Sequence, residues 1–386
     1  MSSWLKQLRA DLDRRGREDM LRRLRATDAC RRQVQREGRS LVNFAGNDYL
    51  ALAGHPKLAD AVAAAARAYG VGSGASRLVS GDLELHGRLE ERLARFKHAE
   101  AALLFPTGYQ ANLGALTALA VEGDLICLDK LNHASLIDAA RASGATVRVY
   151  PHGNLAKLQR LLEGGADAHR RFIVTDAVFS MDGDCADLPG LCDLRDRFEA
   201  VLVVDEAHAT GVLGSSGGGL AEAQGVAGSV DVSICTAGKA LGSLGGVVAG
   251  AREVIDTLIN GARTFIYSTA APPTQVAAID AALDVVATEP QRRERLAALS
   301  RRVRQGLGEL GWPVGADPTP IIPLVVGAAG AALELAAKLE SAGFLAPAIR
   351  PPTVARGAAR VRLSLRCDLE DEDIDRFLAV VGRGPD

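Results

Sequence analysis

Residues 232–242 read Val-Ser-Ile-Cys-Thr-Ala-Gly-Lys-Ala-Leu-Gly, a short apolar run that ends in a glycine-flanked lysine. Only small or uncharged residues surround this lysine, Lys239. Because burying an ammonium group is costly, a lysine in such a setting either loses its charge or forms a covalent bond. The stretch therefore predicts a strand that ends next to a chemically active amine.

A second apolar run, Val201–Val204, ends in an Asp-Glu-Ala-His segment that starts at Asp205, 34 residues before Lys239. Pyridoxal phosphate (PLP) needs an amine for its aldehyde and a carboxylate for its pyridine nitrogen. It also needs backbone amides for its phosphate and a group that stacks on its ring. Lys239 and Asp205 supply the first two groups, so the spacing indicates a PLP site.

The remaining two requirements are met elsewhere in the chain. Gly108 and Tyr109 follow a strand-like run and begin a helix, whose free amides suit a phosphate. Thr236, three residues before Lys239, adds a hydroxyl group. His133 is the natural candidate for stacking on the ring, and His208 is placed to reach its phenolic oxygen.

The Asp-Glu-Ala-His segment also spells the DEAH box of nucleic-acid helicases. Such an ATPase needs the phosphate-binding motif G-x-x-x-x-G-K-[ST]. Here Lys239 is followed by Ala240, and Ser233 stands where the first glycine belongs. We therefore reject the helicase interpretation.

Short apolar strands alternate with helices from about residue 100 onward, which favours an α/β fold with a mostly parallel sheet covered on both faces. In such a sheet ligands bind beyond the carboxyl ends of the strands. The expected strands are Ala101–Phe105, Leu125–Leu128, Thr146–Tyr150, Phe172–Thr175, Val201–Val204 and Val232–Cys235. The expected helices between them include Ala111–Val121, Ser135–Ser143, Leu155–Leu162 and Leu188–Phe198.

The ends of the chain have a different pattern. Residues 4–25 carry leucines at helical spacing and predict an amphipathic N-terminal helix. After residue 273, long helices alternate with two strand-like runs, Ile321–Val326 and Arg360–Arg366, which indicates an α+β region. We expect an N-terminal helical arm at residues 1–45, a large α/β domain at 46–275 and a small C-terminal domain at 276–386.

The bulk composition is that of an ordinary globular protein, with 386 residues, 48% hydrophobic content and a net charge of −2. This charge implies no polyanion, so no nucleic-acid partner is expected. Six scattered cysteines, the lack of a secretory signal and the lack of a long apolar run favour a cytoplasmic protein without a membrane partner. No metal site is expected.

Longer segments identify a family. The chain resembles the α-oxoamine synthases, PLP enzymes of fold type I, which have an aspartate aminotransferase-like large domain and a smaller α+β domain. The resemblance extends over nearly the whole chain, and it rests on Asn47–Leu50, Gly72–Gly81, Val178–Asp184, Asp205–Gly211, Ile266–Thr269 and Ile349–Val354. One departure is Ala51, which stands where a glycine is usual in the family.

The resemblance implies a role for each site residue. Lys239 would be the Schiff-base lysine and the base that removes a substrate proton, and Asp205 would pair with the pyridine nitrogen. His133 and His208 complete the catalytic set. The cofactor-binding residues would be Gly108, Tyr109, His133, Ser180, Asp205, His208, Thr236, Lys239, Ser268 and Thr269.

Substrate binding would involve Arg22, Asn47, His133, Arg350 and Thr353, with Arg350 holding the amino-acid carboxylate. Ser268 and Thr269 resemble the segment that reaches the phosphate of a neighbouring subunit. The resemblance therefore implies a homodimer with active sites at the subunit interface.

Within the family, the segments Arg77–Gly81 and Ile349–Val354 favour a member that condenses L-alanine with a pimeloyl thioester in biotin synthesis, releasing CO2 and a free thiol. The thioester carrier, coenzyme A or acyl carrier protein, stays open. So do two alternatives: a glycine C-acetyltransferase, which shares the PLP residues, and a PLP-binding protein without turnover.

Overall fold

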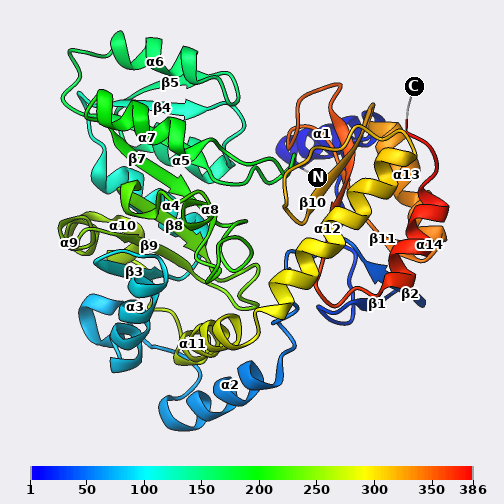
Figure 1. Ribbon diagram of the computed structural model, residues 1–386, viewed down its shortest axis with the longest axis horizontal. Helices are drawn as coiled ribbons and strands as arrows, with labels where there is room; N and C mark the ends of the chain where they lie inside the picture. The colour runs from blue at the N-terminus through cyan, green and yellow to red at the C-terminus, as the bar shows by residue number, and fades with distance from the viewer. Residues whose placement is uncertain (1, 385–386) are drawn as a thin grey trace. The chain divides into compact units, whose positions relative to one another are not determined.

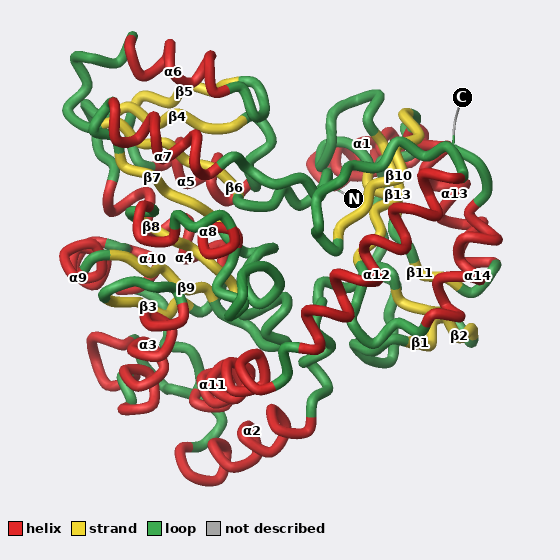
Figure 2. The backbone as a smooth tube through the Cα atoms, viewed as in Figure 1, coloured by secondary structure: helices red, strands yellow, loops and turns green. Residues whose placement is uncertain are grey.

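The computed structural model describes residues 2–384, which form two compact units. The large unit comprises residues 48–180 and 184–295, and the small unit comprises residues 2–47, 181–183 and 296–384. The boundary falls within one helix, α12 (Gln291–Glu309). Figure 1 follows the chain through both units, and Figure 2 separates their helices and strands by colour.

The large unit is built on a sheet of seven strands in the order β3-β9-β8-β7-β6-β4-β5. All neighbouring pairs are parallel except those of β9, which is antiparallel to both β3 and β8. The strands are β3 (Ala101–Phe105), β4 (Leu125–Asp129), β5 (Thr146–Tyr150), β6 (Arg171–Asp176), β7 (Val201–Asp205), β8 (Val232–Thr236) and β9 (Gly246–Gly250).

Helices pack against this sheet because its central strands are apolar on both faces. One buried cluster joins Leu116, Leu136 and Leu258, from three different helices, to strand residues such as Phe172 and Ile234. The helices are α2 (Pro56–Tyr69), α3 (Glu84–Phe96), α4 (Gly108–Leu119), α5 (Ala134–Ala142), α6 (Leu155–Glu163), α7 (Leu188–Arg197), α8 (Leu220–Ala223), α9 (Arg252–Gly261), α10 (Arg263–Ile266) and α11 (Pro273–Thr288). A π-helical turn, η1 (Arg77–Gly81), and a 3₁₀ turn, η2 (Ala227–Ser229), complete the set.

The small unit contains two sheets of three strands, with the orders β1-β2-β11 and β10-β13-β12. Its strands are β1 (Gln33–Arg36), β2 (Arg39–Asn43), β10 (Ile321–Gly327), β11 (Phe344–Leu345), β12 (Ala348–Ile349) and β13 (Ala359–Ser364). Its helices are α1 (Ser3–Arg17), α13 (Ala329–Ser341) and α14 (Asp371–Val381), together with most of α12. The core includes Phe44, Phe344 and Phe377, whose rings lie 5.0–5.9 Å apart.

The α/β prediction is confirmed, and the six expected strands of the large unit agree with the structure to within one residue. Strand β9 was missed, because its glycines at both ends resemble a loop. The predicted N-terminal helix is too long, since α1 ends at Arg17 and Asp19 has a positive φ of 54°. Among residues 2–384, none of the helices is long and apolar enough to cross a bilayer.

Ala51 adopts a φ of 56°, in the left-handed region where a Cβ is unfavourable. We expect Ala51→Gly to raise the free energy of unfolding by about 0.5 kcal/mol, because relief of strain exceeds the entropy that glycine adds to the unfolded chain. Ala53, which is exposed and has no positive φ, provides the control. Ala53→Gly should lower the free energy of unfolding. If calorimetry showed that both substitutions raise it, or that both lower it, this explanation would be contradicted.

Candidate active site

The parallel strands β6, β7 and β8 end at one edge of the large sheet. Asp176 at the end of β6 pairs with Asp205 at the end of β7, and Asp205 pairs with Ile234 of β8. Beyond this edge lies a cavity of about 170 Å³, and all of its lining residues belong to the large unit. They are Gly108, Tyr109, Asn112, His133, Ser135, Asp176, Asp205, Ala207, His208, Ile234, Cys235, Thr236 and Lys239.

The half-buried Lys239 follows β8, and its Nζ lies 2.8 Å from Nε2 of His208. Nδ1 of His208 lies 2.7 Å from the hydroxyl of Tyr49, which is fully buried. Two proton arrangements satisfy both contacts. Either an ammonium donates to Nε2 and Nδ1–H donates to Tyr49, or Tyr49 donates to Nδ1 and Nε2–H donates to a neutral amine. The pair is therefore suited to hold Lys239 in either protonation state.

Asp205 is buried, and both of its carboxylate oxygens accept hydrogen bonds. Oδ1 accepts from the backbone N–H of Ala207 at 2.9 Å. Oδ2 accepts from the side-chain amide of Asn112 on α4 at 2.7 Å. These bonds hold the carboxylate of Asp205 in one orientation against the cavity.

His133 caps the N-terminus of α5, where its Nδ1 lies 2.7 Å from Oγ of Ser135. Its backbone N–H donates to Asp176 Oδ2 at 2.6 Å. The ring remains exposed toward the cavity, which suits a stacking role. Desolvation lowers the pKa of His133, and the charge of Asp205 only partly opposes this. Desolvation, reinforced by Asp205, raises the pKa of Asp176.

The start of α4 forms another wall of the cavity. Thr107 caps this helix, accepting from the Gln110 N–H at 3.2 Å, and the first helical amides lie at Gly108 and Tyr109. Strand β9 passes so close that a Cβ at Gly246 would lie 2.7 Å from the Cα of Gly108. The first amides of a helix have no intrahelical acceptor, so this wall suits a phosphate.

The residues of the cavity fit pyridoxal phosphate. An amine, a buried carboxylate, a helix N-terminus and an accessible imidazole face are the four groups that this cofactor requires, and all four line one cavity. Seven of the predicted cofactor residues lie here: Gly108, Tyr109, His133, Asp205, His208, Thr236 and Lys239.

Three predicted cofactor residues lie outside this lining. Ser180 is half-buried in the turn that follows β6. Ser268 accepts a hydrogen bond from the side-chain amide of Gln110 at 3.0 Å, next to the start of α4. Thr269 is exposed after α10.

The predicted substrate residues other than His133 belong to the small unit. Arg22 donates to the carbonyl of Pro351 at 3.2 Å and to Oγ1 of Thr353 at 3.4 Å. Arg350 donates to the backbone carbonyl of Asp19. Asn47 accepts from Arg362 at 3.2 Å. Arg22, Arg350 and Thr353 therefore gather in one place, where the 351–353 segment meets the chain after α1.

Sequence reasoning missed four residues that contact the predicted set: Tyr49, Asn112, Ser135 and Asp176. Asn112 follows Gly108 by four residues, so helical spacing alone places both on one face of α4. Asp176 ends a strand as Asp205 does, which is a signal that was available. No local pattern could have paired Tyr49 with His208, because 159 residues separate them.

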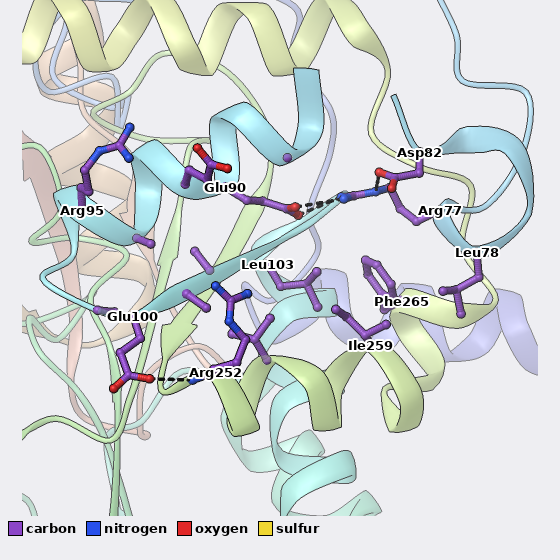
Figure 3. Close-up of a pocket in the computed structure, with 17 residues that line it drawn as sticks. Arg77, Leu78, Asp82, Glu90, Arg95, Glu100, Leu103, Arg252, Ile259 and Phe265 are labelled. Carbon is purple, nitrogen blue, oxygen red and sulfur yellow. Dashed lines mark hydrogen bonds and ion pairs between the residues drawn. The ribbon is translucent and has the colours of Figure 1, made fainter. Parts of the chain in front are cut away.

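A larger cavity of about 400 Å³ lies elsewhere in the large unit, beside α3, β3 and α9 (Figure 3). None of the predicted site residues lines it. Arg77 at this cavity donates to Asp82 at 2.6 Å and to both carboxylate oxygens of Glu90 at 2.8 and 2.9 Å. Glu90 also accepts from the backbone N–H of Leu104 at 2.9 Å. Arg77 thus ties η1 to α3 and β3, which is a structural role.

Comparisons with known proteins identify the family of the chain. The family described as aminotransferase class I and II matches residues 39–381. The chain belongs to this family. It is 50% identical over 348 residues to an 8-amino-7-oxononanoate synthase of Anaeromyxobacter dehalogenans, covering 90% of this chain and 87% of that one. It is 46% identical over 378 residues to the 8-amino-7-oxononanoate synthase of Geobacter metallireducens, covering 97% and 96%.

Two solved structures share the fold. A serine palmitoyltransferase from S. paucimobilis with bound PLP and myriocin superposes with a TM-score of 0.93 at 25% identity, covering 98% of this chain and 96% of that one. The 8-amino-7-oxononanoate synthase of Francisella tularensis gives 0.78 at 29% identity, covering 88% and 96%. The predicted family resemblance and the fold type I architecture are confirmed, and the predicted PLP cofactor agrees with the family.

A third histidine, His152, lies outside the lining of this cavity and joins two loops of the large unit. Nδ1 of His152 lies 3.0 Å from Asp129 at the end of β4, and Nε2 lies 2.6 Å from Asp184, beyond the Ser180 turn. The hydrogen bonds to Asp129 and then Asp184 raise the pKa of His152 to about 10. His152 is therefore an imidazolium at neutral pH, and it joins two of the loops that follow the sheet.

We expect His152→Gln to destabilise the protein by about 2 kcal/mol at pH 6, after discounting for partial exposure. The contribution is complete below the ordinary histidine pKa of 6.5 and is lost as pH rises toward about 10. The gap in melting temperature between the native protein and the variant should therefore narrow from pH 6 to pH 10. His98→Gln, at an exposed histidine, is the control, and a gap that widened with pH would refute the assignment.

Proposed function

We infer that the chain catalyses the PLP-dependent condensation of L-alanine with a pimeloyl thioester. The products are 8-amino-7-oxononanoate, CO2 and a free thiol, and the reaction belongs to biotin biosynthesis. The observation that carries this inference is the near full-length identity, 46–50%, to curated proteins named for this activity. The cavity around Lys239 supplies the chemistry that the reaction needs.

When bound, PLP supplies an aldehyde that links to amines and a protonated ring that withdraws electrons from the substrate Cα. Lys239 would hold the cofactor and, once displaced by alanine, would remove the Cα proton with its free amine. Asp205 would keep the ring nitrogen protonated. His208, 2.8 Å from Lys239 Nζ, would orient that amine and share its proton.

Alanine loses its Cα proton to Lys239, and its Cα bonds to the thioester carbonyl carbon. The thiolate then leaves and takes up a proton, which gives the free thiol. The carboxylate then departs as CO2, and a proton returns to the former Cα.

The small unit would supply the carboxylate site. Arg350 carries a permanent charge and a planar set of donors, which matches a carboxylate. Arg22 and Thr353 are hydrogen-bonded to each other at 3.4 Å and would line the substrate side, with Asn47. Desolvation, reinforced by the cation of Arg22, lowers the pKa of Arg350. An anionic substrate would relieve the repulsion between the two guanidinium groups.

We further propose a homodimer with active sites at the subunit interface. Two features of the chain support it. None of the residues of α1 is buried, and its apolar side chains Trp4, Leu5, Leu8 and Leu12 are exposed. Large apolar patches of this kind usually mark an interface. The exposed Thr269, beside Ser268, suits the expected contact with a partner's phosphate.

Lys239→Ala should lower kcat by about 10³-fold or more, because one substitution removes both the covalent anchor and the base. Borohydride reduction of the native holoenzyme should fix a pyridoxyl group on the Lys239 peptide, detected by mass spectrometry. Lys130→Ala, at an exposed lysine near the same edge of the sheet, should keep the label and the activity. Alanine turnover by Lys239→Ala would refute the assignment.

A substrate panel tests the proposed reaction directly. L-Alanine with pimeloyl-CoA or pimeloyl-acyl carrier protein should release thiol and CO2 in equal amounts. Glycine with acetyl-CoA and L-serine with palmitoyl-CoA should turn over at least about 100-fold less efficiently, because pocket contacts set such discrimination. Preference for either of those pairs would reassign the chain within the family, and an absence of thiol release with every pair would indicate a non-catalytic PLP protein.

A further inference from the structure

A continuous series of side-chain hydrogen bonds connects Asp205, expected at the pyridine nitrogen of the cofactor, to His133, expected on the face of its ring. Nδ2 of Asn112 lies 2.7 Å from Oδ2 of Asp205 and also 2.7 Å from Oγ of Ser135. Oγ of Ser135 lies 2.7 Å from Nδ1 of His133. Asn112 is 2% exposed and Ser135 is fully buried, so bulk water does not compete for these bonds.

The chemistry of the groups fixes which one donates in each hydrogen bond of this series. A carboxylate that keeps a pyridine ring protonated is itself ionised and only accepts, so the Asn112 amide must turn its nitrogen toward Asp205. One N–H then donates to Asp205 and the other to Ser135. Oδ1 of Asn112 has no hydrogen-bond partner among residues 2–384. The two hydrogen bonds of Nδ2 therefore set the orientation of the amide on their own.

Ser135 transmits that orientation to the imidazole. Because its oxygen accepts from Asn112, its own hydrogen is free to donate to Nδ1 of His133. The backbone N–H of Ser135 also points at Nδ1, at 3.3 Å. Two donors on Nδ1 require a lone pair there, so the proton of the neutral ring must sit on Nε2.

We propose that Asn112 and Ser135 are positioning residues that hold His133 in its Nε2–H tautomer. The proposal rests on the PLP-dependent function inferred above. Nε2 lies on the opposite side of the ring from Nδ1, and within the described chain no residue is bonded to it. His133 therefore presents a hydrogen-bond donor to the cavity, which suits a carboxylate or carbonyl oxygen of the substrate. The other tautomer would present a lone pair and repel the same oxygen.

The tautomer is measured on PLP-loaded protein without substrates, so its outcome is independent of the substrate panel. Proton–nitrogen NMR on protein with ¹⁵N-labelled imidazoles distinguishes Nδ1–H from Nε2–H. The chain has seven histidines, and His133→Gln identifies the resonance of interest. The native protein should carry the His133 proton on Nε2. A proton on Nδ1 would overturn the proposal without any variant.

Ser135→Ala removes the hydroxyl donor, and Asn112→Ala removes the group that orients it. Either variant should convert His133 to a mixture of tautomers and lower kcat about tenfold, with the PLP content unchanged. Ser143→Ala, at the other end of α5, is the matched control and should change neither quantity. If Ser135→Ala does not fold, the tautomer of His133 in Asn112→Ala alone tests the proposal. A pure Nε2–H signal in a folded variant would overturn the proposal.

Discussion

The parallel pairing of β6, β7 and β8 is the constraint on which the site depends. The pairing sets Asp176 against Asp205 and Asp205 against Ile234, so the strands end together at one edge. If the pairing register of one strand shifted by one residue, every side chain of that strand would turn to the other face of the sheet. Asp205 would then lose Asn112, and Lys239 would lose its place on the same cavity.

Two lysines of the large unit illustrate how their surroundings decide their roles. Lys97 is buried, and its ammonium contacts the carboxylate of Glu206 and the backbone carbonyl of Gly218. Removing either partner of such a pair would leave a buried, uncompensated charge, so the pair holds the loop after β7 in place. Lys239 is only half-buried and lies against His208 at an accessible cavity. An amine that can change its protonation state there is suited to chemistry.

The site combines two kinds of polar group. Asp205, Lys239 and the start of α4 carry groups proposed to contact the cofactor, whereas Asn112, Ser135 and Tyr49 are hydrogen-bonded to groups of the site. In the proposed arrangement Asn112 and Ser135 fix the proton position on His133, whereas Tyr49 accommodates either proton position on His208. Rigid hydrogen bonding of this type reduces the reorganisation that a reaction requires.

Much of the fold was predictable, because alternating apolar runs and helical spacing are local properties of the chain. The strands that contain Val203 and Ile234 illustrate this. Strand β9 was not predictable, since it is a strand only because β3 and β8 pair with both of its sides. Gly246 is required by the close approach of α4 at Gly108, and a Cβ at Gly250 would meet the carbonyl of Asp231, and both contacts arise only in the folded chain.

By itself, the sequence determined which residue types end the strands, and therefore that Asp205, Lys239 and Gly108 would meet at one edge. That inference needs only the geometry of a parallel sheet. The tertiary structure alone decided the partners of these residues: Tyr49 on His208, and Asn112 between Asp205 and Ser135. These contacts join elements 23 to 159 residues apart, and no local pattern encodes a bond whose two ends are brought together only by folding.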